Sequence, residues 1–430
     1  MKTPSTINEL KNMMDELGVS LPISEDISVL GEKISIGSLT SPNRFVALPM
    51  EGADAADDGG PSELTFRRYE RMALGGAGII WLEACAVQQD GCSNPKSLLI
   101  NECNLNRYKE LVDRIRQAAR ESNQHEVICI LQLTHSGRYS KPFGKPSPII
   151  THHNPALDAL QNLPDDYPIV SDDALDQIQA SFIKSAILAR RAGFDGVDIK
   201  SCHGYLVSGL LAAHTRTGKY GGAYENRTRF LKETIALIKK ESPSLIMTTR
   251  MNAFDGTPYP YGFGVSRDDA DIPDLSEPIQ LAKELVSMGV PILNISIGNP
   301  YFNARYNRPS ATSTNEHPLF GISRFVHIVG EIQKQIPNIP VVTGGLAWLG
   351  QQMPFVAAGL IKGGEAQLIG QGRNSIAYPD CVNDILKHNS FSEKKCCITC
   401  SICSQLLRNG KNSGCVVRDR AFYSIEKNAQ

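Results

Sequence analysis

Eight short apolar runs recur along the chain, and stretches with the periodicity of amphipathic helices separate several of them. The runs are interpreted as strands at 45–48, 78–82, 127–131, 196–199, 246–250, 292–295, 341–343 and 366–369. The helical patterns lie at 107–121, 173–192, 227–240 and 277–288. Repeated strand–helix units predict a parallel sheet, and eight of them predict an α/β protein whose sheet closes into a (β/α)8, or TIM, barrel.

An open, doubly wound α/β sheet is the alternative architecture. Such a sheet commonly carries Gly-x-Gly-x-x-Gly in the turn after its first strand, where the backbone approaches a dinucleotide. The first strand here runs into Pro49, Met50 and Glu51, and this segment contains no glycine. The closed barrel is therefore the preferred prediction.

Segments at both ends lie outside the predicted barrel, which is assigned to residues 30–386. Residues 1–29 form an N-terminal arm with a short amphipathic helix over 6–18. In that helix Thr6 and Glu9 are expected to form a capping box, and Gly18 is expected to end it. Residues 387–430 form a Cys-rich, metal-binding extension.

Composition excludes several classes of partner. A net charge of −1 over 430 residues gives no electrostatic reason to expect nucleic acid or a membrane surface. The N-terminus lacks the apolar run of a signal peptide, and no stretch approaches the 18 consecutive apolar residues of a membrane span. Eleven cysteines without a signal peptide predict a reducing, cytoplasmic compartment, with thiols or metal ligands rather than disulfides. The composition is compatible with a homo-oligomer.

The extension contains four regularly spaced cysteines. They follow the pattern Cys-x2-Cys-x2-Cys-x11-Cys and are Cys397, Cys400, Cys403 and Cys415, with Cys396 as a spare directly ahead. Four thiolates can hold one iron–sulfur cluster or one structural zinc. An accidental group of reduced cysteines is the alternative. Gly410 and Gly414 would let the chain turn back to bring in the last ligand.

Glycines follow the last two predicted strands. Gly344 and Gly345 come after the seventh strand, and Gly372 and Arg373 after the eighth. At these strand ends a TIM barrel commonly binds phosphate, because backbone N–H groups can approach the oxygens and an arginine can bind them with two donors. A phosphate site is therefore predicted here.

Polar residues at other strand ends suit a flavin ring. The amide of Gln132, after the third strand, offers a donor and an acceptor to a pyrimidine edge. Arg250, after the fifth strand, can balance negative charge on a reduced ring. For each residue the alternative is an ordinary hydrogen bond at the mouth of the barrel.

Lys200, His203 and Tyr205 follow the fourth strand within six residues. Lys200 and His203 are predicted to present donors to one oxygen of a substrate. Tyr205 is predicted to be a proton donor to a developing carbanion. Alone, His203 would more often be a structural histidine.

Several of these segments resemble the Old Yellow Enzyme family of FMN oxidoreductases, also called NADH:flavin oxidoreductases. The resemblance spans about residues 30 to 385 and is carried by DGVDIKSCHGYL at 195–206, TRTGKYGGAYENRTRF at 215–230, QLTHSGR at 132–138 and GQGR at 370–373. It implies FMN contacts from Pro49, Met50, Ala84, Gln132, Arg250, Gly345, Gly372 and Arg373. It also implies substrate contacts at Lys200 and His203, and a proton-donor role for Tyr205.

With its Cys-rich extension, the chain is most similar to the branch that includes 2,4-dienoyl-CoA reductase and trimethylamine dehydrogenase. In that branch a comparable set of cysteines binds a 4Fe–4S cluster beside the flavin. Those relatives continue into FAD- and NAD(P)-binding domains, whereas this sequence ends at Gln430. Electrons are therefore expected from NAD(P)H or from a separate electron-transfer protein, or else the cluster is structural.

Two residues depart from the family pattern. The donor pair is usually His with His or Asn, and a lysine at position 200 favours an anionic or strongly polarised carbonyl substrate. Glu51 stands where a small residue, Cys or Thr commonly lies near flavin N5. It is included among the cofactor-binding residues because an acid there could alter the redox potential, unless it turns away from the ring.

Three functions are compatible with these observations. The first is an FMN-dependent ene-reductase, or a related dehydrogenase, with a 4Fe–4S cluster relaying electrons to a small-molecule substrate. The second keeps FMN but places zinc on the cysteines, with hydride arriving directly from NAD(P)H. The third is a flavin-binding subunit or sensor with little turnover, against which Tyr205 argues because a binding module needs no proton donor.

Overall fold

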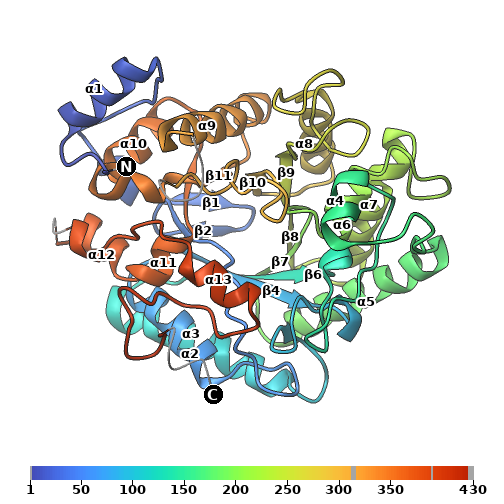
Figure 1. Cartoon of the computed structure of the whole chain (residues 1–430). Helices are drawn as coiled ribbons and strands as arrows, with labels where there is room; N and C mark the ends of the chain where they lie inside the picture. The colour runs from blue at the N-terminus through green and yellow to red at the C-terminus, as the bar shows by residue number, and fades with distance from the viewer. Residues whose placement is uncertain (1, 311–315, 389–390, 425–430) are drawn as a thin grey trace.

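A parallel β-barrel forms the centre of the molecule (Figure 1), a computed structural model that describes residues 2–310, 316–388 and 391–424. The strand order around the sheet is β8-β7-β6-β4-β3-β12-β11-β10-β9. The strands are β3 (Phe45–Ala47), β4 (Ile79–Ala86), β6 (Ile128–Thr134), β7 (Gly196–Ile199), β8 (Ile246–Thr248), β9 (Arg250–Phe254), β10 (Leu293–Ile297), β11 (Val341–Thr343) and β12 (Leu368–Gln371).

The first and last strands in this order, β8 and β9, are two halves of one strand. Only Thr249 separates β8 from β9, and its side-chain hydroxyl donates to the carbonyl of Ile199 on β7 at 2.6 Å. The sheet thus closes, and counting β8 and β9 as one gives the eight strands expected from the sequence. Each of the eight predicted runs lies on one of them, which confirms the (β/α)8 architecture.

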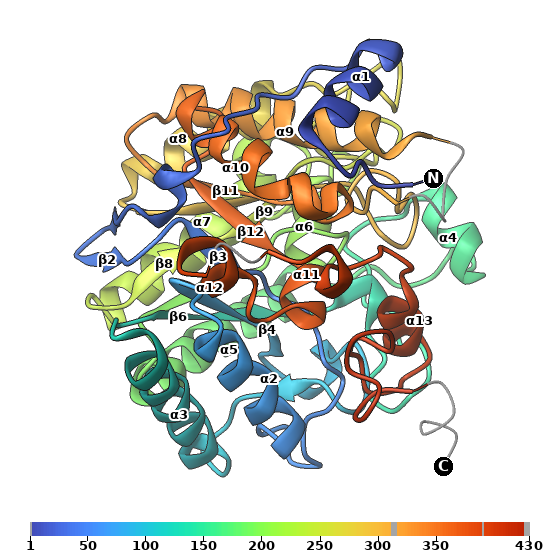
Figure 2. The same ribbon diagram turned by 90° about the vertical axis from the view of Figure 1, so that its left-hand side faces the viewer.

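Helices surround the barrel (Figure 2). Those between successive strands are α2 (Glu63–Leu74), α3 (Leu105–Asn123), α5 (Asp172–Arg191), α7 (Tyr224–Glu241), α8 (Ser276–Ser287), α9 (Pro318–Gln335) and α10 (Met353–Lys362). After β12 come α11 (Arg373–Ala377) and α12 (Cys381–Leu386). The four helices predicted from periodicity are α3, α5, α7 and α8, and their bounds differ from the prediction by three residues at most.

Smaller elements complete the fold. They are α1 (Ile7–Leu17), α4 (Pro155–Gln161), α6 (Leu206–Leu211), α13 (Ile402–Arg408), β1 (Ile34–Ile36), β2 (Leu39–Ser41), β5 (Leu98–Leu99) and 3-10 helices at Ser28–Gly31, Gln89–Gly91, Gly137–Tyr139, Leu346–Gln352 and Glu393–Lys395. The β1–β2 hairpin is antiparallel, and its Ile36 packs with the interior barrel residues Val46, Trp81 and Leu368. This contact fills part of the barrel interior with apolar side chains.

The N-terminal arm packs on the barrel through α1, whose Leu10 and Met14 share an apolar cluster with Val356 of α10. Thr6 caps the helix by accepting from the N–H of Glu9 at 3.1 Å, and Gly18 ends it at φ +63°. The predicted capping box is only half formed. The Glu9 carboxylate accepts from the N–H of Ser5 at 2.7 Å, one residue before the expected Thr6.

Two strand ends differ from the prediction. β4 continues to Ala86, beyond the predicted run at 78–82, and its register with β6 shifts between Leu82 and Ala84. The strand predicted to end at Arg250 continues through β9 to Phe254. The long connection between β6 and α5 contains the helix α4.

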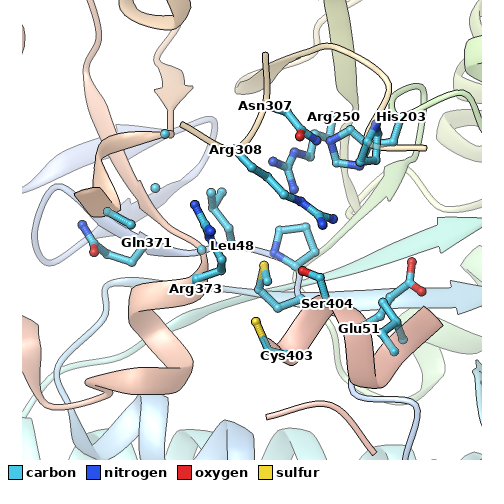
Figure 3. A pocket seen from close by; sticks show the side chains of 18 of the residues that line it. Leu48, Glu51, His203, Arg250, Asn307, Arg308, Gln371, Arg373, Cys403 and Ser404 are labelled. Carbon is cyan, nitrogen blue, oxygen red and sulfur yellow. The ribbon is translucent and has the colours of Figure 1, made fainter. Parts of the chain in front are cut away.

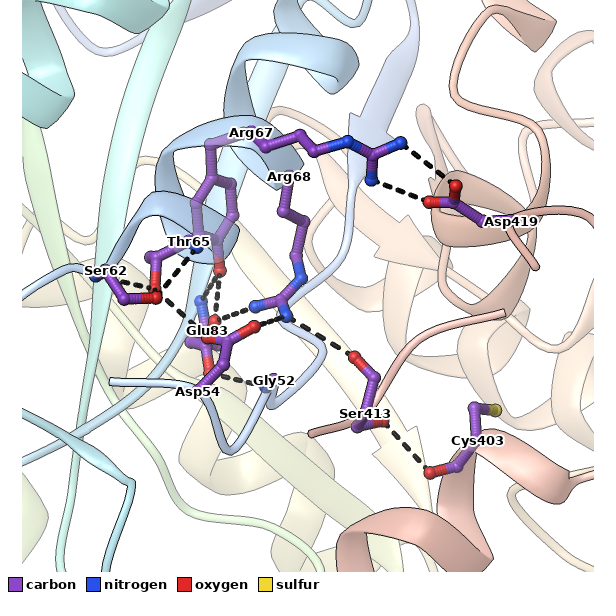
Figure 4. Close-up of polar contacts among 11 residues, drawn as sticks. Gly52, Asp54, Ser62, Thr65, Arg67, Arg68, Glu83, Cys403, Ser413 and Asp419 are labelled. Atoms are coloured by element: carbon purple, nitrogen blue, oxygen red, sulfur yellow. Dashed lines mark hydrogen bonds and ion pairs between the residues drawn. The ribbon is translucent and has the colours of Figure 1, made fainter. Parts of the chain in front are cut away.

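The Cys-rich extension lies against α2 (Figure 4). Arg67 donates to both carboxylate oxygens of Asp419 at 2.7 and 2.9 Å, and Arg71 donates to one of them at 2.7 Å. Arg68 is buried between Asp54 and Glu83 and also reaches the carbonyl of Ser413 at 3.4 Å. Ion pairs therefore hold residues 413–419 to the barrel.

Candidate active site

A pocket opens at the carboxyl ends of the barrel strands (Figure 3), where TIM barrels carry their active sites. Its empty volume is about 1130 Å³, part of it open to solvent. It is lined by eleven of the thirteen residues predicted for catalysis or cofactor binding, namely Pro49, Met50, Glu51, Gln132, Lys200, His203, Tyr205, Arg250, Gly345, Gly372 and Arg373.

The other two predicted residues lie beside the pocket without lining it. Ala84 is buried on β4, opposite Gln132 on β6. Gly344 lies against Leu48 and Phe325, where an added Cβ would stand 3.4 and 3.7 Å from their side chains. Their direct contact with a cofactor stays a prediction.

One end of the pocket suits a phosphate. Gly345 has φ +82°, a conformation that a side chain would strain, and Gly372 leaves its side of the wall open. Arg373 and Arg308 both line the pocket (Figure 3). Neither forms an ion pair with a carboxylate within residues 2–310, 316–388 and 391–424, so their positive charge is available to an anion.

Arg308 was not predicted from the sequence. It follows β10 in a stretch without a recognised motif, and only the fold brings it beside Arg373. Its pKa is lowered to about 10 by burial and by the charges of Arg373 and Arg408. Bringing such cations together raises the electrostatic potential of this end, which favours binding of a dianion such as a phosphate monoester.

Asp198 on β7 orients two residues predicted to contact the ring. Its Oδ2 accepts from Gln132 at 2.6 Å and from the indole of Trp81 at 2.8 Å, and its Oδ1 accepts from the N–H of Arg250 at 2.7 Å. Burial raises the pKa of Asp198 to about 6. The buried Nε of Arg250 has no hydrogen-bond partner in the described part of the chain. This guanidinium is therefore free to bind an anionic ligand.

Glu51, Lys200 and Tyr205 form a compact group in the wall of the pocket. Oε1 of Glu51 accepts from Nζ of Lys200 at 3.0 Å and from the hydroxyl of Tyr205 at 3.1 Å. Nζ of Lys200 also lies 3.7 Å from the centre of the Tyr205 ring. Burial tends to raise the pKa of Glu51, but the charge of Lys200 and the donated hydrogen bonds bring it below its usual value.

The two residues predicted as a donor pair, Lys200 and His203, both line the pocket but have different partners. Lys200 donates to Glu51, so its charge is already balanced. His203 adopts φ +64°, and its Nε2 lies 2.9 Å from Oγ of Ser296. Burial, with the charges of Arg250 and Lys200 nearby, lowers the pKa of His203 far below its usual value. The imidazole is therefore neutral.

Tyr205 is buried and protonated. Burial and the neighbouring Glu51 carboxylate raise its pKa well above the usual value, so the phenol holds a proton that it can donate. Its hydroxyl lies 3.2 Å from that of Tyr301, whose ring stacks on Tyr139 with centroids 3.8 Å apart. Tyr301 was also not predicted, because it lies in the same stretch as Arg308, after β10.

All four cysteines predicted as metal ligands line one small pocket, together with Arg373. Thr399 and Ser401, between the first three, have φ +53° and +61°, so the chain curls tightly. The Sγ atoms of Cys397 and Cys415 accept from the N–H groups of Thr399 at 3.4 Å and Arg418 at 3.3 Å. Such N–H···S bonds suit thiolate ligands.

Cys396 lies apart from the four predicted metal ligands. Its Sγ donates to the carbonyl of Ser392 at 3.4 Å, and the residue packs in an apolar cluster with α12. Gly410 makes a turn at φ +69°, whereas Gly414 is needed for packing, since a Cβ there would lie 2.3 Å from Tyr423. Within residues 2–310, 316–388 and 391–424, no group of three or more His, Cys, Asp or Glu side chains is arranged closely enough to hold a metal ion.

The barrel, the cationic end of its pocket and the protonated Tyr205 are the features expected of a flavin-dependent barrel oxidoreductase. A family model described as the NADH:flavin oxidoreductase / NADH oxidase family matches residues 30–390. The chain belongs to this family. The match confirms the resemblance noted in the sequence and the prediction of an FMN-dependent oxidoreductase.

Similar proteins include an NADH oxidase from Thermoanaerobacter brockii, 29% identical over 85% of this chain and 52% of its own length. A cinnamate reductase from Clostridium sporogenes is 26% identical over 92% of this chain and 58% of its own. A solved 2-naphthoyl-CoA reductase in complex with 2-naphthoyl-CoA shares the fold, with a TM-score of 0.74 and 21% identity over 92% of this chain and 57% of that one. The chain spans about half the length of these relatives.

Among the described residues there is no helix with the length and apolar character needed to cross a membrane.

Proposed function

We propose that the chain binds FMN in the barrel pocket and reduces an activated carbon–carbon double bond, or carries out a related dehydrogenation. The observation that carries this proposal is the protonated Tyr205 in one pocket with the unpartnered guanidinium of Arg250 and the cations Arg308 and Arg373. A cofactor with an acceptor ring and a phosphate matches this distribution of charge.

The residues have separate roles in this proposal. Arg308, Arg373 and the backbone at Gly345 and Gly372 would hold the phosphate, while Gln132 and Arg250 would hold the pyrimidine edge. When bound, the flavin supplies the two-electron chemistry that side chains lack. Tyr205 would donate a proton to the substrate carbon on which negative charge develops.

The substrate is proposed to be a small molecule whose double bond is conjugated to a carbonyl group. The neutral His203 can donate to that oxygen without adding charge, provided its tautomer carries a proton on the nitrogen that faces the pocket. Because Lys200 is balanced by Glu51, a polarised carbonyl is favoured over a free anion at this position.

Cys397, Cys400, Cys403 and Cys415 are proposed to draw together around a 4Fe–4S cluster, which would supply one-electron transfer. Cys403 lines both the cysteine pocket and the barrel pocket, and Arg373 also lines both. A cluster there would neighbour the flavin site. The donor ahead of the cluster would be NAD(P)H, acting through a flavin, or a separate electron-transfer protein.

Anaerobic purification followed by reconstitution with FMN, iron and sulfide tests the proposal. We expect tight flavin binding, about four iron and four sulfide per chain on the cubane stoichiometry, and reoxidation of the reduced protein by an α,β-unsaturated ketone. Protein that stays colourless would contradict the flavin site. One zinc per chain without iron would favour direct reduction of the flavin by NAD(P)H. Bound flavin that the alkene does not reoxidise would favour a flavin-binding subunit with little turnover.

A further inference from the structure

The carboxylate of Glu51 lies where two pockets meet. Beside the active-site pocket is a second one with about 1070 Å³ of empty volume, part of it open to solvent. It is lined by residues that follow β4, β6 and β10 and by the end of α13. Glu51, Tyr301 and Leu407 line both pockets. Of these three, only Glu51 carries a carboxylate, a group that can take up a proton from water and pass it on.

The two oxygens of Glu51 have different partners. Oε1 accepts from Lys200 and Tyr205, which line the active-site pocket. Oε2 accepts from Oγ of Ser93 at 2.9 Å, and Ser93 lines the second pocket. Figure 3 shows Glu51 on the opposite side of the active-site pocket from Gln371. The carboxylate thus contacts a donor from each pocket.

We propose that Glu51 relays protons from the second pocket to Tyr205, and so restores the acid after each turnover. The proposal rests on the function proposed above, in which Tyr205 donates a proton to substrate. In that step the Tyr205 O–H bond breaks and a substrate C–H bond forms, which leaves a phenolate. Glu51, which is ionised at rest, then takes a proton from a water in the second pocket, which leaves hydroxide to solvent, and passes that proton to the phenolate.

Lys200 makes this relay feasible. A carboxylate beside a buried phenolate would be strongly unfavourable, because two like charges would share a site of low polarity. The ammonium of Lys200 is hydrogen-bonded to Glu51 and lies 3.7 Å from the ring centre of Tyr205, so it stabilises both anions.

A purely positional role is the competing explanation. In that case Glu51 would only hold Lys200 and Tyr205 in place, and a glutamine could do so through its amide oxygen. A glutamine cannot gain and release a proton near neutral pH. Proton exchange at Tyr205 therefore separates the two roles, and it can be measured without any substrate.

The experiment uses full-length, FMN-reconstituted protein labelled with 13C at Cζ of tyrosine, in an equal mixture of H2O and D2O. The Cζ signal of Tyr205 is identified by its absence in Tyr205→Phe. Separate signals for the O–H and O–D forms appear when hydroxyl exchange is slow, and they merge when it is fast. We expect Glu51→Gln to slow this exchange on the order of 10²-fold, the lower range for a positioned proton-transfer group.

Two further variants complete the test. Tyr301→Phe removes the other hydroxyl beside Tyr205 and leaves Glu51 in place, so it should not slow exchange. Glu51→Gln leaves Lys200 buried without its counter-charge. If this single variant fails to fold, the double variant Glu51→Gln with Lys200→Met serves as a second protein that lacks the relay. Unchanged exchange in whichever Glu51 variant folds would overturn the relay.

The exchange result is independent of the proposed reaction. If no alkene reoxidises the reduced protein, the proposed function fails while the exchange measurement still decides the relay. If an alkene is reduced, later turnovers of Glu51→Gln should be slower than its own first turnover, because Tyr205 begins each experiment protonated. Equal rates for the first and later turnovers of this variant would contradict a reprotonation role.

Discussion

The backbone N–H of Ser413 donates a 2.6 Å hydrogen bond to the carbonyl of Gly52, the residue directly after Glu51. The hydroxyl of Ser413 donates to the carbonyl of Cys403 at 3.0 Å, and Glu83 accepts from the N–H of Gly52 at 2.6 Å (Figure 4). These bonds connect the cysteine loop to the end of β3. The position of the predicted metal site therefore depends on how the extension docks against the barrel.

Asp419→Ala should loosen that docking. The carboxylate accepts three hydrogen bonds from Arg67 and Arg71, and its side chain is 9% exposed. Its loss leaves two partly exposed guanidinium groups without their partner, so we expect a cost of about 1–3 kcal/mol, confined to the extension. Hydrogen–deuterium exchange should rise over residues 391–424 and stay unchanged in the barrel. Glu331→Ala, which breaks an exposed pair with Lys334, is the control and should change neither region.

Arg308→Ala should weaken FMN binding. If each arginine makes a charged hydrogen bond to the phosphate, its removal costs about 1.5–3 kcal/mol, which is on the order of 10- to 100-fold in dissociation constant. Arg373→Ala should have a similar effect, but this residue also lines the cysteine pocket. Quenching of flavin fluorescence during titration measures both, with the exposed Arg120→Ala as control. Unchanged binding in Arg308→Ala would place the phosphate elsewhere.

The barrel was predictable because its signal is local and repeated. Each strand is a short apolar run with a helix pattern close by, and closure follows from counting the units. Gly345 and Arg373 could be found for the same reason, since their place directly after a strand indicates the barrel mouth. Breaks within strands were not predictable, because the interruption at Thr249 depends on hydrogen bonds to β7.

Contacts between distant residues could not be predicted. Lys200 and Glu51 stand 149 residues apart, and nothing in either segment indicates that their charges meet. The expectation of an anionic or strongly polarised carbonyl substrate rested on Lys200 alone, without the ion pair to Glu51. Arg308 and Tyr301 were missed because their segment carries neither glycine spacing nor a motif that indicates a strand end.

Tyr205→Phe should separate the two halves of the reaction. The ring stays in place and only the proton donor is lost, so reoxidation of the reduced flavin by an alkene should slow by roughly 10²–10⁴-fold. Reduction of the flavin by its electron donor should be nearly unchanged. Rapid-mixing measurements follow each half separately. Equal slowing of both halves would mean that Tyr205 is structural, and Tyr301→Phe, which keeps the Tyr205 hydroxyl, is the matched control.

Asp198→Asn should change how stability depends on pH. Burial raises the pKa of Asp198 from 3.8 to about 6, so between these values the folded chain binds more protons at this site than the unfolded chain. The free energy of unfolding therefore falls as the pH rises through this range, and the contribution of Asp198 should fall by about 1 kcal/mol between pH 5 and pH 7. Asparagine does not titrate, so the variant should lack this part of the decline.

Urea unfolding of both proteins at several pH values measures the difference, with all other titrating groups common to the two. The variant's free energy of unfolding relative to wild type should improve steadily from pH 5 to pH 7, whatever its absolute value. Asn keeps one acceptor, and its NH2 group replaces either Oδ1, which faces the N–H of Arg250, or Oδ2, which faces both Trp81 and Gln132. A constant offset between the two proteins across this range would show that Asp198 is already ionised at pH 5, and that Arg250 and its hydrogen bonds outweigh burial.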